Sequence, residues 1–118
     1  MTEVDVLFAG VPIADIEAAA SWYAQLLGRS ADVVVTSDEV MWRFADGAWL
    51  YIIEDRERAG RTLVTLCVAD LDRTLAEING RGISSGSVEI VGDSGRKSVI
   101  IDPDGNSLSF IEVVAPPH

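Results

Sequence analysis

The sequence is poor in cysteine, in histidine and in long apolar stretches, and each shortage excludes a class of protein. It has one cysteine, Cys67, so no disulfide can form within the chain. Its one histidine, His118, is the last residue, which leaves no internal imidazole for a Ser–His or Cys–His catalytic pair or for a histidine-based metal site. No apolar run approaches the roughly 18 residues that a membrane-spanning helix requires.

Basic residues are also scarce, because 9 lysines and arginines face 19 aspartates and glutamates and give a formal net charge of −10. Nucleic acids and anionic membranes bind through lysine and arginine, so both are excluded as partners. The same negative field attracts a cationic small molecule. The start of the chain carries none of the basic residues that open a secretion signal, so we expect a cytoplasmic protein in a reducing compartment.

The chain has 118 residues, which predicts a single domain over residues 1–118. A first repeat is expected over residues 3–56. Its opening stretch, Val4–Val11, is rich in valine, leucine and phenylalanine and predicts a buried strand. Asp15 is placed to cap a helix whose apolar stripe runs from Ile16 to Leu27 and which stops at Gly28. Three further strands are predicted at Asp32–Ser37, Glu39–Ala45 and Ala48–Glu54, the last two joined by a tight Asp46-Gly47 turn.

The same order of elements is predicted again in a second repeat, over residues 62–114, after an exposed charged connection at 55–61. Leu63–Val68 predicts a strand. Asp70 is placed to cap a helix whose apolar stripe runs from Leu71 to Ile78 and which ends near residues 79–82. The remaining predictions are strands at Ser87–Val91, Arg96–Asp102 and Asn106–Val113, an Asp104-Gly105 turn, and a frayed tail at Ala115–His118.

Two short motifs occur in both halves of the chain and indicate an internal duplication. Ile13-Ala-Asp-Ile matches Val68-Ala-Asp-Leu at an offset of 55 residues, and Phe44-Ala-Asp-Gly matches Asp102-Pro-Asp-Gly at an offset of 58. Because one βαβββ unit leaves one face of its sheet uncovered, two units together are expected to enclose that face. The predicted fold class is therefore α+β, with two βαβββ repeats.

These motifs, together with Trp22-Tyr23 and Leu27-Gly28 in and after the first helix, resemble the vicinal oxygen chelate superfamily. This superfamily holds glyoxalase I, extradiol dioxygenases, fosfomycin-resistance enzymes and bleomycin-resistance proteins. Asp102-Pro-Asp-Gly-Asn106 is the most specific of the motifs, and the resemblance covers nearly the whole chain. The resemblance implies that the mixed sheets of the two repeats curl into a half-barrel around a cavity, with the helices on the outer face.

The resemblance also implies where a metal site would lie, and this sequence departs from the superfamily there. Its enzymes hold a divalent metal with His, His, Glu and a Glu or Gln, at positions that correspond here to Phe8, Leu63, Ser109 and Tyr51. These side chains do not offer the ligands that such a cation needs. We therefore expect no metal and no other cofactor, and the sequence identifies no catalytic residue.

Strand alternation predicts which side chains lie on the sheet face away from the helices. That face is expected to be apolar and aromatic with a few hydroxyl groups, which suits an organic ligand held by burial and stacking. The alternative is that the same side chains simply fill the half-barrel as its core. The face is predicted to carry Val6, Phe8, Trp49, Tyr51, Ile53, Leu63, Thr65, Cys67, Ser107, Ser109 and Ile111. The predicted ligand-binding residues are Phe8, Trp42, Trp49, Tyr51, Leu63, Thr65, Ser107 and Ser109.

The function predicted on this basis is that of a metal-free small-molecule-binding protein of the glyoxalase/bleomycin-resistance type. Bleomycin-resistance proteins are metal-free acidic dimers that sequester a cationic, planar-aromatic drug. The resemblance therefore implies a homodimer that sequesters an aromatic or cationic natural product and so gives drug resistance. A second hypothesis is a metal-independent isomerase, cyclase or lyase with Ser109, Tyr51 or Glu112 as acid or base, although Glu112 is expected to face away from the cavity. A third is a dimerisation or regulatory module without a ligand.

Five further side chains carry specific expectations. Tyr23 is predicted to be a core residue, and its neighbour Trp22 is predicted to be partly exposed. Cys67 is predicted to be a small buried thiol. Glu54 is predicted to be a solvated loop carboxylate. For Arg43, which lies among apolar strand residues, both a carboxylate partner and an anionic ligand remain open.

Overall fold

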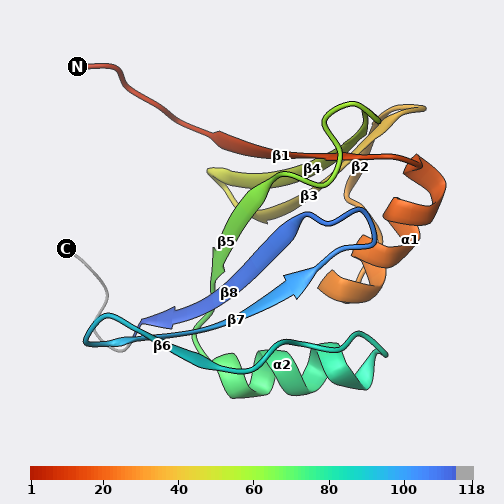
Figure 1. The fold of residues 1–118 in the computed structure, drawn as a ribbon. Helices are drawn as coiled ribbons and strands as arrows, with labels where there is room; N and C mark the ends of the chain where they lie inside the picture. The colour runs from red at the N-terminus through yellow and green to blue at the C-terminus, as the bar shows by residue number, and fades with distance from the viewer. Residues whose placement is uncertain (114–118) are drawn as a thin grey trace.

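The computed structural model describes residues 1–113, which fold into two βαβββ modules (Figure 1). The predicted tail at 115–118 lies outside these residues. Neither helix of the described chain is long and apolar enough to span a membrane. Module 1 consists of β1 (Leu7–Ile13), α1 (Ile16–Leu27), β2 (Val33–Thr36), β3 (Glu39–Ala45) and β4 (Ala48–Glu54). Module 2 consists of β5 (Leu63–Cys67), α2 (Leu71–Gly80), β6 (Glu89–Val91), β7 (Gly95–Ile101) and β8 (Ser107–Val113).

Each module forms a mixed four-stranded sheet in which the first and last strands lie side by side. The strand orders are β1-β4-β3-β2 and β5-β8-β7-β6. β1 runs parallel to β4 and β5 runs parallel to β8, whereas the other neighbours are antiparallel. The predicted α+β fold with two βαβββ repeats is therefore confirmed, and the two sheets do not close into a barrel over the part of the chain described.

The first strand begins later than the sequence predicts, because its partner strand limits it. β1 begins at Leu7, which pairs with Ala48, the first residue of β4 after the hairpin turn. No residue of β4 is left to pair with Val4 or Val6, so the predicted strand is wrong over its first three residues. β1 instead continues to Ile13, and the remaining predicted boundaries agree with the observed ones or differ from them by one or two residues.

One hydrophobic core joins the two modules. Alternate strand residues and the inner stripes of both helices contribute to it, and we call these the helix-side residues. The opposite sides of the two sheets are called the open faces. Because helix-side residues of both modules pack into the same core, both open faces lie on the outside of the chain. The expectation that the two units of one chain enclose this face is therefore wrong. The most deeply buried core residues are Val11, Ile13, Tyr23, Leu26, Trp42, Leu50, Ile52, Leu71, Ile78, Ile100 and Leu108.

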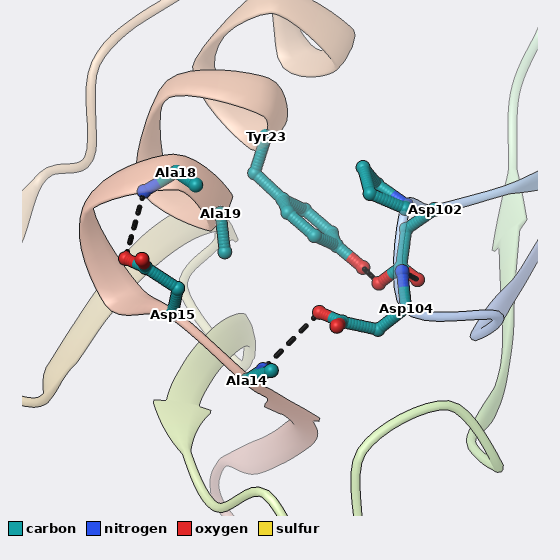
Figure 2. Close-up of a pocket in the computed structure, with 8 residues that line it drawn as sticks. Ala14, Asp15, Ala18, Ala19, Tyr23, Asp102 and Asp104 are labelled. Carbon is teal, nitrogen blue, oxygen red and sulfur yellow. Dashed lines mark hydrogen bonds between the residues drawn. The ribbon is translucent and has the colours of Figure 1, made fainter.

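The turn Asp102–Asn106, between β7 and β8, holds module 2 against module 1. The buried Asp102 carboxylate accepts hydrogen bonds from two backbone amides of its own turn at 2.9 and 2.8 Å and from Asn106 Nδ2 at 2.8 Å. A fourth hydrogen bond comes from the hydroxyl of Tyr23, on α1 of module 1, at 2.7 Å (Figure 2). Burial raises the pKa of Tyr23 far above its usual range, and the hydrogen bond to Asp102 raises it further. The hydroxyl therefore keeps its proton and remains a donor.

The Asn106 side chain ties further segments to this turn. Besides its bond to Asp102, its Nδ2 group donates to the carbonyl oxygen of Pro12, near the end of β1, at 2.9 Å. Its Oδ1 atom accepts from the amides of Gly60 and Thr62, both at 3.0 Å. Asn106 is fully buried, and one amide group thereby joins β1, the connection between the modules and the start of β8.

Two glycines allow the connection between the modules to approach the turn. Gly60 and Gly105 have φ angles of 91° and 103°, in the region that favours glycine. A Cβ atom on Gly60 would lie 2.3 Å from the carbonyl oxygen of Asp104, far inside van der Waals contact. A side chain at Gly60 would therefore push the connection off the turn and break its hydrogen bond to Asn106.

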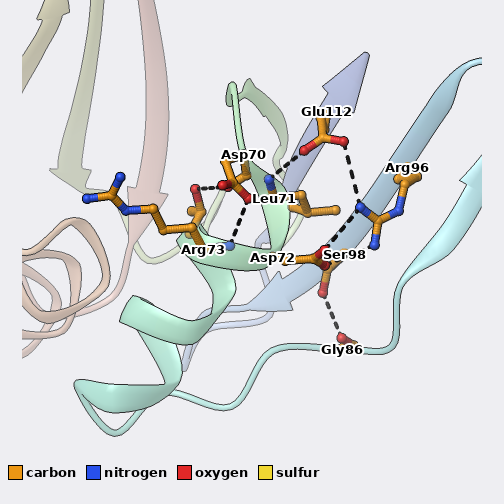
Figure 3. A network of polar contacts seen from close by, with 9 residues as sticks. Asp70, Leu71, Asp72, Arg73, Gly86, Arg96, Ser98 and Glu112 are labelled. Carbon is orange, nitrogen blue, oxygen red and sulfur yellow. Dashed lines mark hydrogen bonds and ion pairs between the residues drawn. The ribbon is translucent and has the colours of Figure 1, made fainter. Parts of the chain in front are cut away.

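Each helix begins beside two carboxylates, an aspartate at its cap and a glutamate from the last strand of its module. Asp15 caps α1 by accepting from two backbone amides of the first turn, and Asp70 caps α2 by accepting from one, as the sequence predicts. Glu54, at the end of β4, accepts from the first amide of α1 at 3.1 Å. Glu112, near the end of β8, accepts from the first amide of α2 at 2.8 Å and lies 3.7 Å from an Arg96 nitrogen (Figure 3). Glu54 is exposed, so the prediction of a solvated carboxylate is confirmed, but it is the last residue of β4 and not a loop residue. Glu112 lies on the helix side as predicted.

Replacing Asn106 with alanine is expected to be among the most damaging single changes in the chain. The change removes four side-chain hydrogen bonds and leaves backbone groups without partners, each at a cost of about 1–3 kcal/mol. The free energy of unfolding from urea denaturation should fall by at least about 3 kcal/mol. Asn79→Ala, at an exposed position of α2, is the control and should cost less than about 1 kcal/mol. Equal losses in the two variants would contradict this role of Asn106.

The raised pKa of Tyr23 leads to a prediction of how the free energy of unfolding changes at alkaline pH. In the unfolded chain its hydroxyl titrates near the ordinary value of 10.0, whereas the raised pKa in the folded protein keeps it protonated. The contribution of Tyr23 to the free energy of unfolding is therefore fully present below pH 10.0. It is lost as the pH rises further, because unfolding then releases a proton. Urea denaturation between about pH 8 and 11 should show a shallower loss of stability in Tyr23→Phe than in the wild type. Parallel pH profiles would rule this out.

Candidate ligand-binding site

The open face of module 1 carries three aromatic side chains that the sequence predicts to bind a ligand. Phe8 of β1 and Trp49 of β4 are register partners, and their rings stack with centroids 6.0 Å apart and planes inclined by 29°. Tyr51, two residues along β4, lies opposite Gly10, and its ring leans over that glycine. Phe8 is 50% exposed, and Trp49 and Tyr51 are half-buried. The structure therefore brings the three rings to one accessible surface.

Arg43 lies beside this aromatic surface and has a carboxylate partner. It pairs with Trp49 across β3 and β4, and its guanidinium forms an ion pair with Asp46 in the hairpin turn. Its backbone amide donates to Asp32 Oδ2 at 2.7 Å. This hydrogen bond, with smaller contributions from Arg29 and Arg43, lowers the pKa of Asp32. Of the two roles that the sequence leaves open for Arg43, the structure shows the carboxylate partner.

The open face of module 2 presents hydroxyl groups and aliphatic side chains. Leu63 pairs with Ser107 and Thr65 pairs with Ser109 in the parallel register of β5 and β8. Leu63 and Thr65 are exposed, and the two serines are half-buried. The predicted ligand-binding residues are therefore divided between an aromatic face on one sheet and a hydroxyl-bearing face on the other.

Trp42 is the one predicted ligand-binding residue that lies on neither open face. It is fully buried on the helix side of β3, where its ring centroid lies 6.2 Å from that of Tyr23 and its Nε1 group donates to the carbonyl of Arg29 at 2.9 Å. Alternation explains the placement, because its neighbour Arg43 shares the open face with Trp49. The prediction that Trp42 contacts a ligand is therefore wrong, and Trp42 is a core residue.

Cys67 is exposed rather than buried. It lies on the open face of β5, in register with Ile111, and β5 is one of the two edge strands of its sheet. The prediction of a small buried thiol is therefore wrong, because burial depends on how the two modules pack and not on the apolar sequence around it. The predictions for the first helix are confirmed, since Tyr23 is fully buried and Trp22 is partly exposed.

The four positions at which the superfamily resemblance places metal ligands do not fit a metal ion here. Phe8 and Tyr51 lie on the open face of module 1, and Leu63 and Ser109 lie on that of module 2. Phe8 and Leu63 have no donor atom, and the neutral hydroxyls of the other two are poor substitutes for carboxylate or imidazole. Within residues 1–113, no three histidine, cysteine, aspartate or glutamate side chains are grouped so that they could hold a metal.

Two apolar hollows lie between the modules, and one of them is lined by a predicted ligand-binding residue from each module. The first, of about 120 Å³, lies between the β3–β4 hairpin and β5, and both Trp49 and Thr65 line it. The second, of about 330 Å³, shares Phe44 and Ala48 with the first and extends to Cys67. The predicted ligand-binding residues that line neither hollow are Phe8, Tyr51, Leu63, Ser107 and Ser109, besides the buried Trp42.

A smaller hollow of about 90 Å³ lies between α1 and the turn that begins at Asp102 (Figure 2). Three carboxylates line it, but each already has a structural partner. Asp15 caps α1, Asp104 accepts from the amide of Ala14 at 3.2 Å, and Asp102 accepts four hydrogen bonds. This hollow is therefore a packing gap beside the turn that joins the modules.

Comparison with known proteins identifies the family. The sequence matches no protein-family model and no curated protein, but it matches solved structures. A glyoxalase/bleomycin resistance protein from Catenulispora acidiphila DSM 44928 is 39% identical, with 92% of this chain and 97% of that chain covered and a TM-score of 0.86. The chain belongs to the glyoxalase/bleomycin resistance protein family. Membership of this family confirms the resemblance to the vicinal oxygen chelate superfamily.

More distant structures share the fold with this family member. TnmS3, an antibiotic binding protein from Streptomyces sp. CB03234, is 21% identical over 96% of this chain and 97% of that chain, with a TM-score of 0.73. A bleomycin-binding protein complexed with bleomycin is 19% identical over 92% of this chain and 98% of that chain, with a TM-score of 0.74. At these identities the likeness shows the fold alone.

The two tryptophans on opposite sides of the module 1 sheet should differ in what they contribute to stability. Trp42→Ala leaves a large cavity in the core and should lower the free energy of unfolding by about 3–5 kcal/mol. Trp49→Ala removes a ring from the open face and should cost less than about 1.5 kcal/mol. Urea denaturation of both variants measures the difference. Equal losses would mean that Trp49 is a core residue, as the alternative interpretation of the sequence holds.

Proposed function

We propose that this family member is a metal-free small-molecule-binding protein that sequesters an aromatic or cationic natural product and so confers resistance to it. The observation that carries the proposal is an aromatic surface at positions where the superfamily enzymes hold a metal. Phe8 and Tyr51 occupy two of these positions, and Phe8 stacks with Trp49. A planar ligand gains affinity on such a surface by stacking and by burial of apolar area, so it needs no metal to be held.

The charge of the protein supports a cationic ligand. The formal net charge is −10, and the basic side chains of the open faces stand beside acidic partners. Arg43 forms an ion pair with Asp46, and the Lys97 ammonium lies 4.0 Å from a carboxylate oxygen of Glu89. Because these positive charges are balanced locally, the negative field of the rest of the protein favours the approach of a cation.

A homodimer is part of the proposal, because the predicted ligand-binding residues of one chain lie on two separate sheets. A second copy related by two-fold symmetry could set the aromatic face of one chain against the hydroxyl-bearing face of the other, and would do so twice. It could also cover Leu7 and Leu63 on the edge strands, which are 67% and 83% exposed. We place this dimer in the cytoplasm, where the exposed Cys67 thiol would stay reduced.

Catalysis finds less support than binding. An acid–base reaction needs an acid and a base within hydrogen-bond reach of one substrate. Glu112 lies on the helix side and is engaged by the first amide of α2. Tyr51 and Ser109 lie on the open faces of different sheets. The residues that the sequence offers as acid or base therefore do not form a pair within one chain.

Binding can be tested with bleomycin, the ligand of the structurally similar bleomycin-binding protein. Metal-free bleomycin is titrated into the protein while tryptophan fluorescence is recorded, and we expect saturable quenching. Trp49→Ala and Tyr51→Ala should each weaken the affinity about three- to tenfold, because the loss of one aromatic contact costs about 0.5–1.5 kcal/mol.

Trp22→Ala is the matched control for this titration, because it removes a tryptophan of α1 that lies outside the open faces. Its affinity should equal that of the wild type. Unchanged affinity in both open-face variants would show that the ligand binds elsewhere. A wild-type protein that binds neither bleomycin nor other planar cationic antibiotics would contradict the function itself.

A further inference from the structure

Gly10, in the middle of β1, leaves a space that the Tyr51 ring fills. A Cβ atom at Gly10 would lie 2.3 Å from Cζ, 2.4 Å from Oη and 2.8 Å from Cε2 of Tyr51, far inside van der Waals contact. Gly10 is not one of the glycines with a positive φ angle, so its backbone conformation suits any residue. The requirement for glycine comes from the Tyr51 ring alone.

The space above Gly10 allows the Tyr51 ring to lie across β1. Gly10 and Tyr51 are register partners, so the ring leans from β4 across β1, which is one of the two edge strands of the sheet. Phe8 and Trp49 form the next pair of the same face, two residues along each strand and roughly 7 Å away. Phe8, Trp49 and Tyr51 therefore lie on one face of the same two strands, and we call this set of three side chains the aromatic platform.

We propose that Gly10 is a positioning residue that widens the aromatic platform, so that it takes a planar ligand of two or three fused or linked aromatic rings. This inference rests on the proposed function and adds the size class of the ligand. One ring of the ligand stacks on the Phe8–Trp49 pair, and the adjoining ring reaches Tyr51 because that side chain lies across β1. With a side chain at position 10 the Tyr51 ring has to swing away from β1, and the platform shrinks to the stacked pair.

A purely structural role for Gly10 leads to different expectations. An aromatic ring laid over a strand glycine can stabilise a sheet without taking part in binding. In that case a substitution at Gly10 lowers the melting temperature but leaves the ligand affinity unchanged. The two roles are therefore separated by measuring Tm and Kd on the same set of variants.

The experiment compares the wild type with Gly10→Ala, Tyr51→Ala, the double variant and Gly80→Ala. Gly80, in α2, is the matched control because a Cβ atom there would meet nothing within 4 Å. Affinities are measured by tryptophan fluorescence for proflavine, a planar cation of fused rings, and for benzamidine, a cation with a single ring. The Tm of each variant is recorded in the same buffer.

We expect the wild type to bind proflavine at least about tenfold more tightly than benzamidine. Gly10→Ala should weaken proflavine binding about tenfold and change benzamidine binding by less than about twofold. The double variant should bind proflavine and benzamidine with the same affinities as Tyr51→Ala alone, because the ring that the new side chain displaces is already absent. Gly80→Ala should match the wild type for both probes.

The outcomes separate this inference from the proposed function. Unchanged proflavine affinity in Gly10→Ala, with or without a lower Tm, would overturn the role of Gly10 and leave the binding function in place. A wild type that binds neither probe would overturn both. If Gly10→Ala does not fold, the double variant still decides the question, since a further loss of proflavine affinity relative to Tyr51→Ala would contradict the proposal.

Discussion

A carboxylate that is withdrawn from water is stable only when its oxygens are fully hydrogen-bonded, and Asp102 meets this condition with donors from both modules. Its own turn supplies two amides, Asn106 supplies a third donor, and Tyr23 of module 1 supplies the fourth. Separating the modules would remove the Tyr23 donor and the α1 side chains that bury this carboxylate. The turn therefore fixes how the helix sides of the two modules meet, and this arrangement leaves both open faces on the outside.

Much of the fold could be predicted from the sequence because its determinants are local and occur twice. Caps at Asp15 and Asp70, tight Asp-Gly turns and alternating strands are each visible within a few residues. The side of the sheet on which Trp42 lies is harder to predict, because it depends on the register of β3 with β4, which is irregular just beyond Trp42. The contact of Glu54 joins residues 38 apart, and only its equivalence to Glu112 at the repeat offset of 58 could have indicated it. The partner of Gly10, likewise, is set by strand pairing and not by neighbouring sequence.

The separation between the core and the open faces explains how the residues of the open faces can vary without a change of fold. The contacts that join the modules lie on the helix side, whereas Phe8, Tyr51, Leu63 and Ser109 lie on the open faces. Substitution at these four positions therefore leaves the joining turn intact. The side chains at these positions decide the chemistry that the surface offers, and here they are aromatic rings, an aliphatic side chain and hydroxyl groups.

Whether an aromatic surface has replaced the metal site is tested most directly by native mass spectrometry of the untagged protein. Spectra are recorded before and after incubation with excess Zn²⁺, Mn²⁺ or Ni²⁺, and again with metal-free bleomycin. We expect the mass of a dimer that acquires no stoichiometric metal adduct and that retains the organic ligand. A metal adduct of one ion per site, removed by a chelator, together with no ligand adduct in the absence of metal, would contradict a metal-free binding protein.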